Sequence, residues 1–528
     1  MHLVSSHSSH PDAMKTVAPG SDTKGHSNDI QEVLDYGDSY TEEEERAVVR
    51  KIDLAVLPMI CGVFFLQYLD KQSLSYAGAF ELITDLGLTN SQYSWCSSIF
   101  YVGQLVSEFP IIYLLSRLHL TKFVGVTIIL WGGLCMCLAA PQNFAGFAAV
   151  RFLLGIAEGA VSPAFVTITS VWYRKGEHAS RTALWISMNG LAQIVGCLLM
   201  YGIGKNGALN IQPWRVLFLV CGAMTVAAGV GFYLFMPNGP NEVWFLNARQ
   251  KHVLSLRMVK DREGGDKTSF SSSQLKETVK DGKAWFAFWF GVLVTMQSPV
   301  LTVSLQLATK PTKQYYANVF TKFASLVIKG LGYDKFQTLL NTAPSGAVQI
   351  AMLWLGILCC TLLPKNRTFV AMALCIPPLI GNIFLMKLTA NDGWGMIVAA
   401  WISSCITAPW TILLSLTASN VKGNTKRSIV NTAFFIGYCA GCIASPQLWT
   451  DRPRYFEGVV TAIVTWCLLF LATLAYRIVC ARDNANRDRV LNGVDVSAGG
   501  AEQVDIDTSG AAKGDLTDKE DSNFRYSL

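Results

Sequence analysis

Residues 54–76 read LAVLPMICGVFFLQYLDKQSLSY, a stretch in which only Asp70 and Lys71 carry a charge. A helix needs about 20 consecutive apolar residues to cross the hydrocarbon core of a bilayer. The stretch is therefore predicted to span a membrane as an α-helix, because lipid offers no partner to an unpaired backbone amide. About fifty polar residues precede it, which is unlike a cleaved signal peptide with its short basic leader.

Eleven further apolar stretches follow the first one. Together they predict an all-α membrane protein of 12 transmembrane helices in two six-helix halves. We assign residues 51–236 to the amino-terminal half, residues 237–283 to a central loop and residues 284–480 to the carboxy-terminal half. The predicted spans are Leu54–Tyr76, Ser91–Leu115, Phe123–Ala140, Phe144–Trp172, Thr182–Gly204, Trp214–Met236, Trp285–Ala308, Thr338–Pro364, Phe369–Leu388, Trp394–Thr417, Ile429–Leu448 and Val459–Val479.

Basic residues in the short loops predict the orientation, since Lys and Arg accumulate on the cytoplasmic side of membrane proteins. With the amino terminus inside, the inner loops collect most of these residues, and both termini and the central loop are cytoplasmic. The net charge of +6 then reflects topology, and no nucleic-acid partner is expected. The polar tails, residues 1–50 and 481–528, are predicted to be disordered.

The two halves share a weak repeat. A Lys-Gly step followed by an Arg occurs in residues 175–181, after the fourth span, and in residues 422–427, after the tenth. Two related halves are typical of transporters that rock around a central site.

Charged residues inside the spans are the main candidates for a functional site, because a charge in hydrocarbon is costly unless it faces a cavity or a partner. Asp70 and Arg151 lie at similar depths, which predicts an ion pair between them. Glu158 follows Arg151 by seven residues and shares its helix face. This face suits a carrier that couples anions to protons. Static structural pairs are the alternative for Arg151, Lys71 and Glu108.

Two polar residues in the spans, Asn189 and Gln349, are candidates for contact with a solute. Hydrogen bonding between helices is the alternative for both. Residues 202–207 match the pattern G-x-G-x-x-G, but no strand precedes them, so we interpret them as a turn and expect no cofactor. The histidines of the first tail fit no metal-ligand spacing, and no metal is expected. Motifs of membrane-embedded enzymes were not found, and we expect no enzyme activity.

Several short motifs lie in or beside the predicted spans. With the six-plus-six arrangement, they make the chain resemble the major facilitator superfamily, and within it the fungal anion:cation symporters of the allantoate-permease-like group. The resemblance covers roughly residues 50–480. The motifs are Leu69-Asp70-Lys71-Gln72-Ser73, Glu108-Phe109-Pro110, Arg151-Phe152-Leu153-Leu154-Gly155, Trp214-Arg215, Pro344-Ser345-Gly346 and Pro453-Arg454-Tyr455.

The resemblance implies a secondary active transporter in the plasma membrane, and we expect it to be a monomer. It implies proton-coupled uptake of a small organic anion by alternating access, with allantoate, ureidosuccinate, nicotinate or a similar carboxylate as substrate. Asp70 or Glu158 would load the proton, and Arg151 would hold the carboxylate. Two alternatives stay open: an exporter of a fungal secondary metabolite, and a nutrient sensor that binds its solute without transporting it.

The chain departs from this family at two places. The loop after the second span, residues 116–122, lacks the acid and the glycines that are usual there. Residues of about 298–316 look inserted after the seventh span. We interpret them as a retained intron or a misjudged splice site, which would make the predicted seventh span partly artificial.

Overall fold

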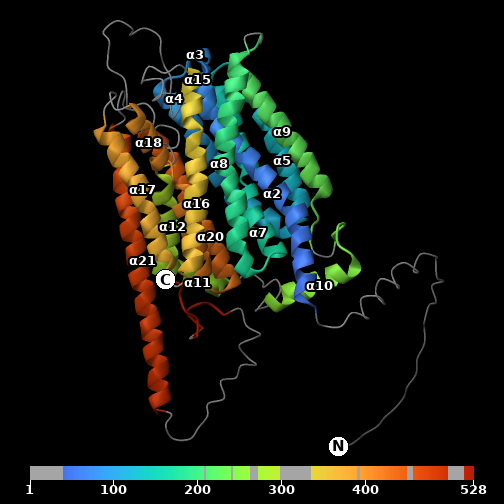
Figure 1. The fold of residues 1–528 in the computed structure, drawn as a ribbon, viewed down its shortest axis with the longest axis vertical. Coiled ribbons are helices and arrows are strands. Elements are labelled where there is room, and N and C mark those ends of the chain that lie inside the picture. Colours follow the sequence, from blue (N-terminus) through green and yellow to red (C-terminus); the bar gives the residue numbers. More distant parts are fainter. Residues whose placement is uncertain are drawn as a thin grey trace, which may run out of the picture.

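A computed structural model of the chain shows long helices that run side by side in two groups (Figure 1). The blue-to-green helices of the amino-terminal half lie beside the yellow-to-red helices of the carboxy-terminal half. Eleven helices among the described residues are long and apolar enough to cross a membrane. The structure describes residues 40–206, 210–239, 242–261, 271–297, 335–364, 366–388, 393–448, 456–497, 516–521 and 523–528.

The helices of the amino-terminal half begin where the sequence offers caps. The hydroxyl of Thr41 accepts a hydrogen bond from the backbone of Glu44, and Thr89 caps the next long helix in the same way. Such caps satisfy the free amides of a first helical turn. The predicted fourth span is broken into two helices before Val161. The elements are α2 (Glu42–Ala79), α3 (Leu82–Asp85), α4 (Asn90–Arg117), α5 (Leu120–Cys137), α6 (Phe144–Glu158), α7 (Val161–Trp172), α8 (Lys175–Lys205) and α9 (Pro213–Phe235).

The carboxy-terminal half follows the predicted spans from the eighth onward. Of the seventh span, the structure shows a short apolar helix that ends at Thr295, and the rest of that span lies outside the described residues. The proposed insertion at residues 298–316 also lies outside them. The elements are α12 (Gly282–Thr295), α15 (Lys335–Thr342), α16 (Pro344–Leu362), α17 (Arg367–Lys387), α18 (Gly393–Ser403), α19 (Thr407–Ser419), α20 (Asn424–Ala444), the 3₁₀ helix η3 (Ser445–Leu448) and α21 (Phe456–Ser497).

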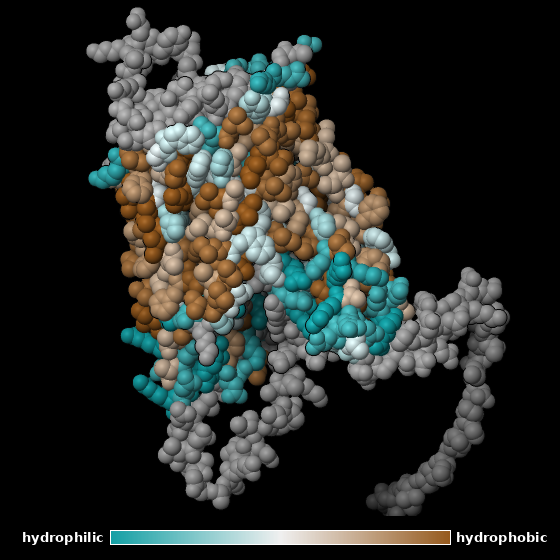
Figure 2. Space-filling model, in the orientation of Figure 1, coloured by the Kyte–Doolittle hydropathy of each residue, from teal (hydrophilic) through white to brown (hydrophobic). Residues whose placement is uncertain are grey.

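The surface of the bundle is apolar around its middle. Figure 2 shows brown side chains along the helices and teal side chains at the end near α10. Leu54, Phe109, Leu234 and Leu362 are each at least 62% exposed, although they are large and apolar. Exposed apolar patches of this extent are expected where lipid replaces water.

The central segment forms two helices, α10 (Ala248–Asp261) and α11 (Ser272–Lys280). They lie at the same end of the bundle, which we call the loop face (Figure 1). The guanidinium of Arg257, on α10, is fully buried and forms ion pairs with Glu45 and Glu177 of the amino-terminal half. Lys426, at the start of α20, pairs with Glu277 of α11 at 2.8 Å. Each half therefore holds one helix of the central segment.

The tails differ from the sequence-based prediction. The first helix begins at Glu42, within the predicted disordered tail. The last helix, α21, continues to Ser497, and residues 516–521 and 523–528 fold back onto the loop face. Polarity indicated disorder, but Ala, Arg and other helix formers extend α21 beyond the apolar span, and specific ion pairs hold the final segment. Residues 1–39 and 498–515 lie outside the described residues.

The two halves meet along two helix pairs. Gly190 of α8 faces Gly346 of α16 so closely that a Cβ on either residue would clash with the carbonyl oxygen of the other. On the second pair, the Ser98 hydroxyl of α4 donates to the carbonyl of Ile443 on α20 at 2.8 Å. Small residues permit this close approach of helix backbones in a membrane. The candidate site lies between these two seams.

Candidate functional site

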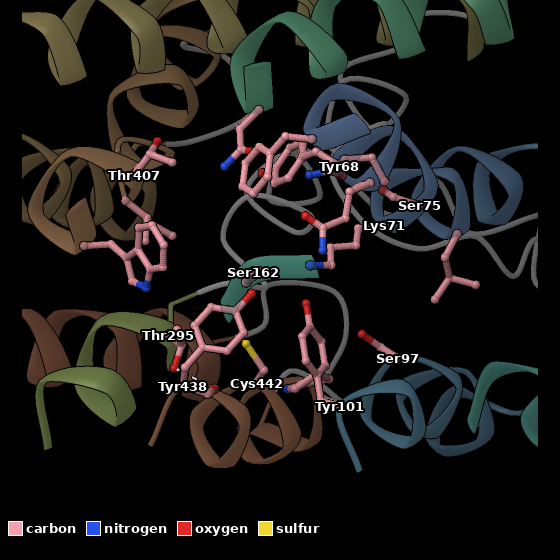
Figure 3. A pocket seen from close by; sticks show the side chains of 18 of the residues that line it. Tyr68, Lys71, Ser75, Ser97, Tyr101, Ser162, Thr295, Thr407, Tyr438 and Cys442 are labelled. Carbon is pink, nitrogen blue, oxygen red and sulfur yellow. Dashed lines mark hydrogen bonds between the residues drawn. The ribbon is translucent and has the colours of Figure 1, made fainter. Parts of the chain in front are cut away.

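A cavity of about 180 Å³ lies between the halves and is lined by both of them (Figure 3). Its walls combine aromatic rings with hydroxyl and amide groups, the mixture that is typical of small-molecule sites. Of the described residues that line it, Lys71 is the one that carries a charge. The polar and aromatic lining includes Gln67, Tyr68, Lys71, Gln72, Ser75, Ser97, Tyr101, Ser162, Asn189, Thr295, Thr407, Trp410 and Tyr438.

Lys71 points from α2 into the cavity (Figure 3). Its ammonium lies 2.8 Å from a carboxylate oxygen of Glu158, the last residue of α6. The Lys71 side chain is 17% exposed, whereas that of Glu158 is 1% exposed. The acid is thus buried behind the cation. In a low-dielectric interior, removal of one charge from such a pair leaves the other uncompensated.

Asp70 and Arg151 do not form the predicted ion pair in the structure. The carboxylate of Asp70 accepts a hydrogen bond from Thr225 of α9 at 3.3 Å, and neither Asp70 nor Arg151 lines the cavity. The guanidinium of Arg151 donates from Nε to the backbone carbonyl of Cys96 at 3.3 Å. The depth argument located both residues along the helix axes but could not fix the direction of each side chain. Successive helical residues point about 100° apart, so α2 aims Lys71 at the cavity and Asp70 at the amino-terminal half.

Arg151 and Lys71 flank the same aromatic ring. The guanidinium of Arg151 lies 5.7 Å from the centroid of Phe100, and the ammonium of Lys71 lies 5.9 Å from it. Both distances are within the range of cation–π attraction. Arg151 therefore lies behind the cavity wall and supports the ring next to Lys71.

The other three sequence candidates have different surroundings. Asn189 of α8 lines the cavity. Gln349 of α16 does not, and its amide donates to Gln193 of α8 at 2.7 Å across the junction of the halves. Its carbonyl accepts from Thr407, which does line the cavity. Glu108 of α4 is buried at 3% exposure, away from the cavity lining.

Several lining residues carried no signal in the sequence. Tyr101 and Tyr438 meet with ring centroids 6.1 Å apart, and Trp410 lies 6.4 Å from Tyr438. These rings come from α4, α19 and α20, so both halves contribute to one aromatic wall. Tyrosine and tryptophan are frequent throughout the apolar spans, and only the packing of helices distant in sequence distinguishes these three.

Comparison with known proteins identifies the family. The sequence profile of the Major Facilitator Superfamily matches residues 60–446. The chain belongs to the major facilitator superfamily. It is therefore a transporter and not an enzyme, and its multi-pass helical fold is that of this superfamily.

Fungal relatives extend over nearly the whole chain. An uncharacterized transporter of Schizosaccharomyces pombe is 33% identical, over 94% of this chain and 90% of the relative. The allantoate permease of Saccharomyces cerevisiae is 29% identical, over 92% of this chain and 87% of the permease. The resemblance to allantoate-permease-like proteins is thus confirmed.

Solved structures agree on the fold. The proton:xylose symporter XylE bound to 6-bromo-6-deoxy-D-glucose has a TM-score of 0.56 to this chain and 16% sequence identity, and the match covers 81% of this chain and 95% of XylE. A bacterial homolog of the human lysosomal transporter Spinster, in an inward-facing and unoccupied conformation, has a TM-score of 0.55 and 13% identity, and the match covers 83% of this chain and 98% of the homolog.

Proposed function

We propose that the protein takes up a small organic anion together with a proton, by alternating access around the Lys71 cavity. The observation that carries this proposal is the 2.8 Å ion pair between Lys71, which lines the cavity, and Glu158, which is buried behind it. A cation between two halves is a natural site for a carboxylate. Its partner acid is a natural site for the coupled proton.

The pair explains how binding of the two ions is linked. While Glu158 is ionised, it neutralises Lys71 and competes with any anion in the cavity. A proton on Glu158 removes this competitor and leaves an ammonium without a counter-ion, so the affinity for an anion rises. The anion in turn stabilises the protonated acid, because linkage between two bound species is reciprocal. The empty carrier returns with the ion pair closed, which avoids exposing a lone charge to the membrane interior.

The size and walls of the cavity favour a small substrate. Hydroxyl groups of Ser75, Ser97, Ser162 and Thr407 face the cavity with the amide of Asn189 and can bind polar substituents. The relative named allantoate permease supports a carboxylate substrate of the ureide type, and ureidosuccinate and nicotinate carry the same anionic group. Arg151 and Asp70 then act as supporting residues rather than as direct ligands.

We place this monomeric carrier in the plasma membrane, with the loop face and both termini in the cytoplasm. The basic residues of the inner loops support this orientation. On the loop face, Arg174 and Arg181 pair with Glu45 and Asp53 at 2.6 and 2.9 Å.

Uptake by yeast cells that lack their own anion permeases tests the proposal. Cells that express the protein should accumulate at least one labelled anion from a panel of allantoate, ureidosuccinate and nicotinate. The variant Lys71→Met should lower this uptake about ten- to a hundredfold at equal membrane abundance, the range expected when a charged hydrogen-bond partner is removed. Lys205→Met, at the exposed end of α8, is the matched control and should transport normally.

Three results would contradict the proposal. Unimpaired uptake by Lys71→Met would remove the cation from the mechanism. Loss of preloaded label from the cells, in place of accumulation, would show an exporter. Saturable binding of a panel anion without flux in proteoliposomes would show a sensor.

A further inference from the structure

The loop face carries a second, independent assembly of charged groups, formed by the docked tail segment (residues 516–521 and 523–528). We propose that Thr517 is a phosphorylation site and that a phosphate there releases this segment from the loop face. The inference does not depend on the substrate or on the direction of transport. It requires only that the loop face be cytoplasmic.

Side chains of the membrane domain bind the backbone of the tail segment at several points along its length. Asn484 of α21 exchanges two hydrogen bonds with the backbone of Tyr526, both at 2.9 Å. Asn420, directly after α19, does the same with Ser527, at 2.9 and 2.7 Å. Arg487 donates to the carbonyls of Asp518 and Phe524, both at 2.6 Å. These partners recognise the peptide backbone and not a single charge.

Side chains of the tail segment are buried against the loop face. Tyr526 is 3% exposed and belongs to the hydrophobic core, and its hydroxyl donates to Asp518 at 2.7 Å. Asp518 is 1% exposed and pairs with Lys426 at 2.8 Å. A buried carboxylate next to a buried ammonium is costly to separate, so the docked position is specific.

Thr517 sits where added negative charge would be most disruptive. Its side chain is fully buried, and its hydroxyl donates to Glu277 of α11 at 3.0 Å. The carboxylates of Glu277, Asp281 and Asp518 lie within 4.8 Å of one another. The ammonium of Lys426 already pairs with all three, so it is the cation of this cluster and no metal ion is needed.

A phosphate on Thr517 would place up to two negative charges beside these carboxylates. Like-charge repulsion and the cost of burying a dianion both oppose docking. The membrane helices do not depend on the segment, because Lys426 keeps Glu277 and Asp281 as partners after release. Loss of the Thr517–Glu277 hydrogen bond would also leave α11 with fewer contacts to the carboxy-terminal half.

The sequence around Thr517 fits an acid-directed protein kinase. It reads Thr517-Asp518-Lys519-Glu520-Asp521, with acids at the first, third and fourth positions after the hydroxyl. In the reaction, the Thr517 oxygen forms a bond to the γ-phosphorus of ATP, and the bond from that phosphorus to the β–γ bridging oxygen breaks. The hydroxyl proton passes to the kinase base, and ADP leaves. Because docked Thr517 is buried, the kinase acts on the undocked segment, and the phosphate then prevents its return.

Hydrogen exchange on the full-length protein in lipid nanodiscs tests both docking and release. In the wild type, the amides of residues 526 and 527 should exchange at least about tenfold more slowly than in a free peptide of the same sequence, since both are hydrogen-bonded. Thr517→Ser keeps the hydroxyl and should preserve this protection, whereas Thr517→Glu should abolish it. Wild-type exchange at the free-peptide rate, or full protection in Thr517→Glu, would overturn the proposal.

The rate of phosphorylation gives a second readout. With ATP and a purified acid-directed kinase, mass spectrometry should find phosphate on Thr517. The variant Asn484→Ala weakens docking at the polar end of α21, beyond its predicted span, and should therefore be modified several times faster than the wild type. Equal rates, or no phosphate on Thr517 in either protein, would contradict a site controlled by docking.

Discussion

At the scale of single residues, the charge that the cavity presents depends on the side-chain directions of Asp70 and Lys71, which are adjacent on α2. Asp70 points at Thr225 in the amino-terminal half, and Lys71 points into the space between the halves. Glu158, which pairs with Lys71, is the last residue of α6, and the helix is interrupted between it and α7. We therefore propose that Lys71 binds the anion and that Glu158 binds the proton.

The variant Glu158→Gln tests that assignment. Glutamine imitates the protonated acid, so Lys71 lacks its counter-ion at every pH. The affinity for a transported anion should become independent of pH between about 5 and 8, while the wild type should bind more tightly as the pH falls through the titration of the acid. Titration calorimetry on the purified protein measures this. Glu108→Gln removes a buried acid away from the cavity and should keep the wild-type pH dependence of anion affinity. An affinity independent of pH in this variant would contradict the assignment of the proton to Glu158.

At the scale of helices, the crossing of α8 and α16 brings the halves together. Gly190 and Gly346 touch through their backbones at the crossing, and Trp354 of α16 donates to Ser187 of α8 at 3.0 Å on the same seam. Alternating access requires such seams to open and close, so their contacts must favour one state without locking it.

Gly190→Ala is expected to impair this seam. Its Cβ would clash with the Gly346 carbonyl, so the helices cannot reach their observed distance, and the population shifts toward the state in which the seam is open. Uptake should fall severalfold, with normal amounts of protein in the membrane. Gly202→Ala on the same helix meets no atom within 4 Å and is the matched control. Equal transport by the two variants would show that close approach at Gly190 is not needed.

The sequence predicted the helices better than it predicted their contacts. A long apolar run such as residues 54–76 must be helical in lipid. The spans from α2 to α9 and from α16 to α21 could therefore be located from composition alone. Whether Asp70 or Lys71 faces the centre depends on how α2 is rotated against α6 and α8, which hydropathy does not encode. The aromatic wall of Tyr101, Trp410 and Tyr438 depends on the contact between Tyr101 and Tyr438, which lie more than 300 positions apart in the sequence. The polarity of the residues after the last span predicts disorder, but their helix propensity extends α21 to Ser497.

At the scale of the whole molecule, the central segment is attached to both halves. Arg257 ties α10 to Glu177, in the first turn of α8, and Lys426, in the first turn of α20, ties α11 to the carboxy-terminal half. Glu177 and Lys426 lie in the two segments that share the Lys-Gly repeat. The two related segments thus both bind a helix of the central segment, with the charges exchanged: Glu177 in the first half and Lys426 in the second.

Arg257→Met should weaken the first attachment. The guanidinium is fully buried between Glu45 and Glu177, so its removal leaves two carboxylates without this partner and costs about 3 kcal/mol. The melting temperature in detergent should fall by several degrees. Arg46→Met removes an ion pair that is exposed to solvent and should leave the melting temperature nearly unchanged. A similar melting temperature for both variants would show that α10 is not held by Arg257.

The docked tail segment should resist moderate acid. Burial acts to raise the pKa of Asp281 and of Asp521, but hydrogen bonds and attraction from Lys426 and Lys422 outweigh it, so both pKa values are lowered. A lowered folded-state pKa gives stability that is present above the unfolded value of about 3.9 and is lost as the pH falls through the folded value. Hydrogen-exchange protection of residues 526 and 527 should thus be constant from pH 8 to about pH 5 and fall only below about pH 4. Release near pH 6 would contradict this charge assignment.

The central claim, that one buried ion pair couples an anion to a proton, is tested most directly by proton flux in proteoliposomes. The measurement records internal pH with a trapped dye while a panel anion that supports uptake in yeast is added outside. We expect the wild type to acidify the lumen only when the anion is present, and Glu158→Gln to exchange labelled anion across the membrane without moving protons. Anion-driven acidification by Glu158→Gln at the wild-type rate would contradict the account.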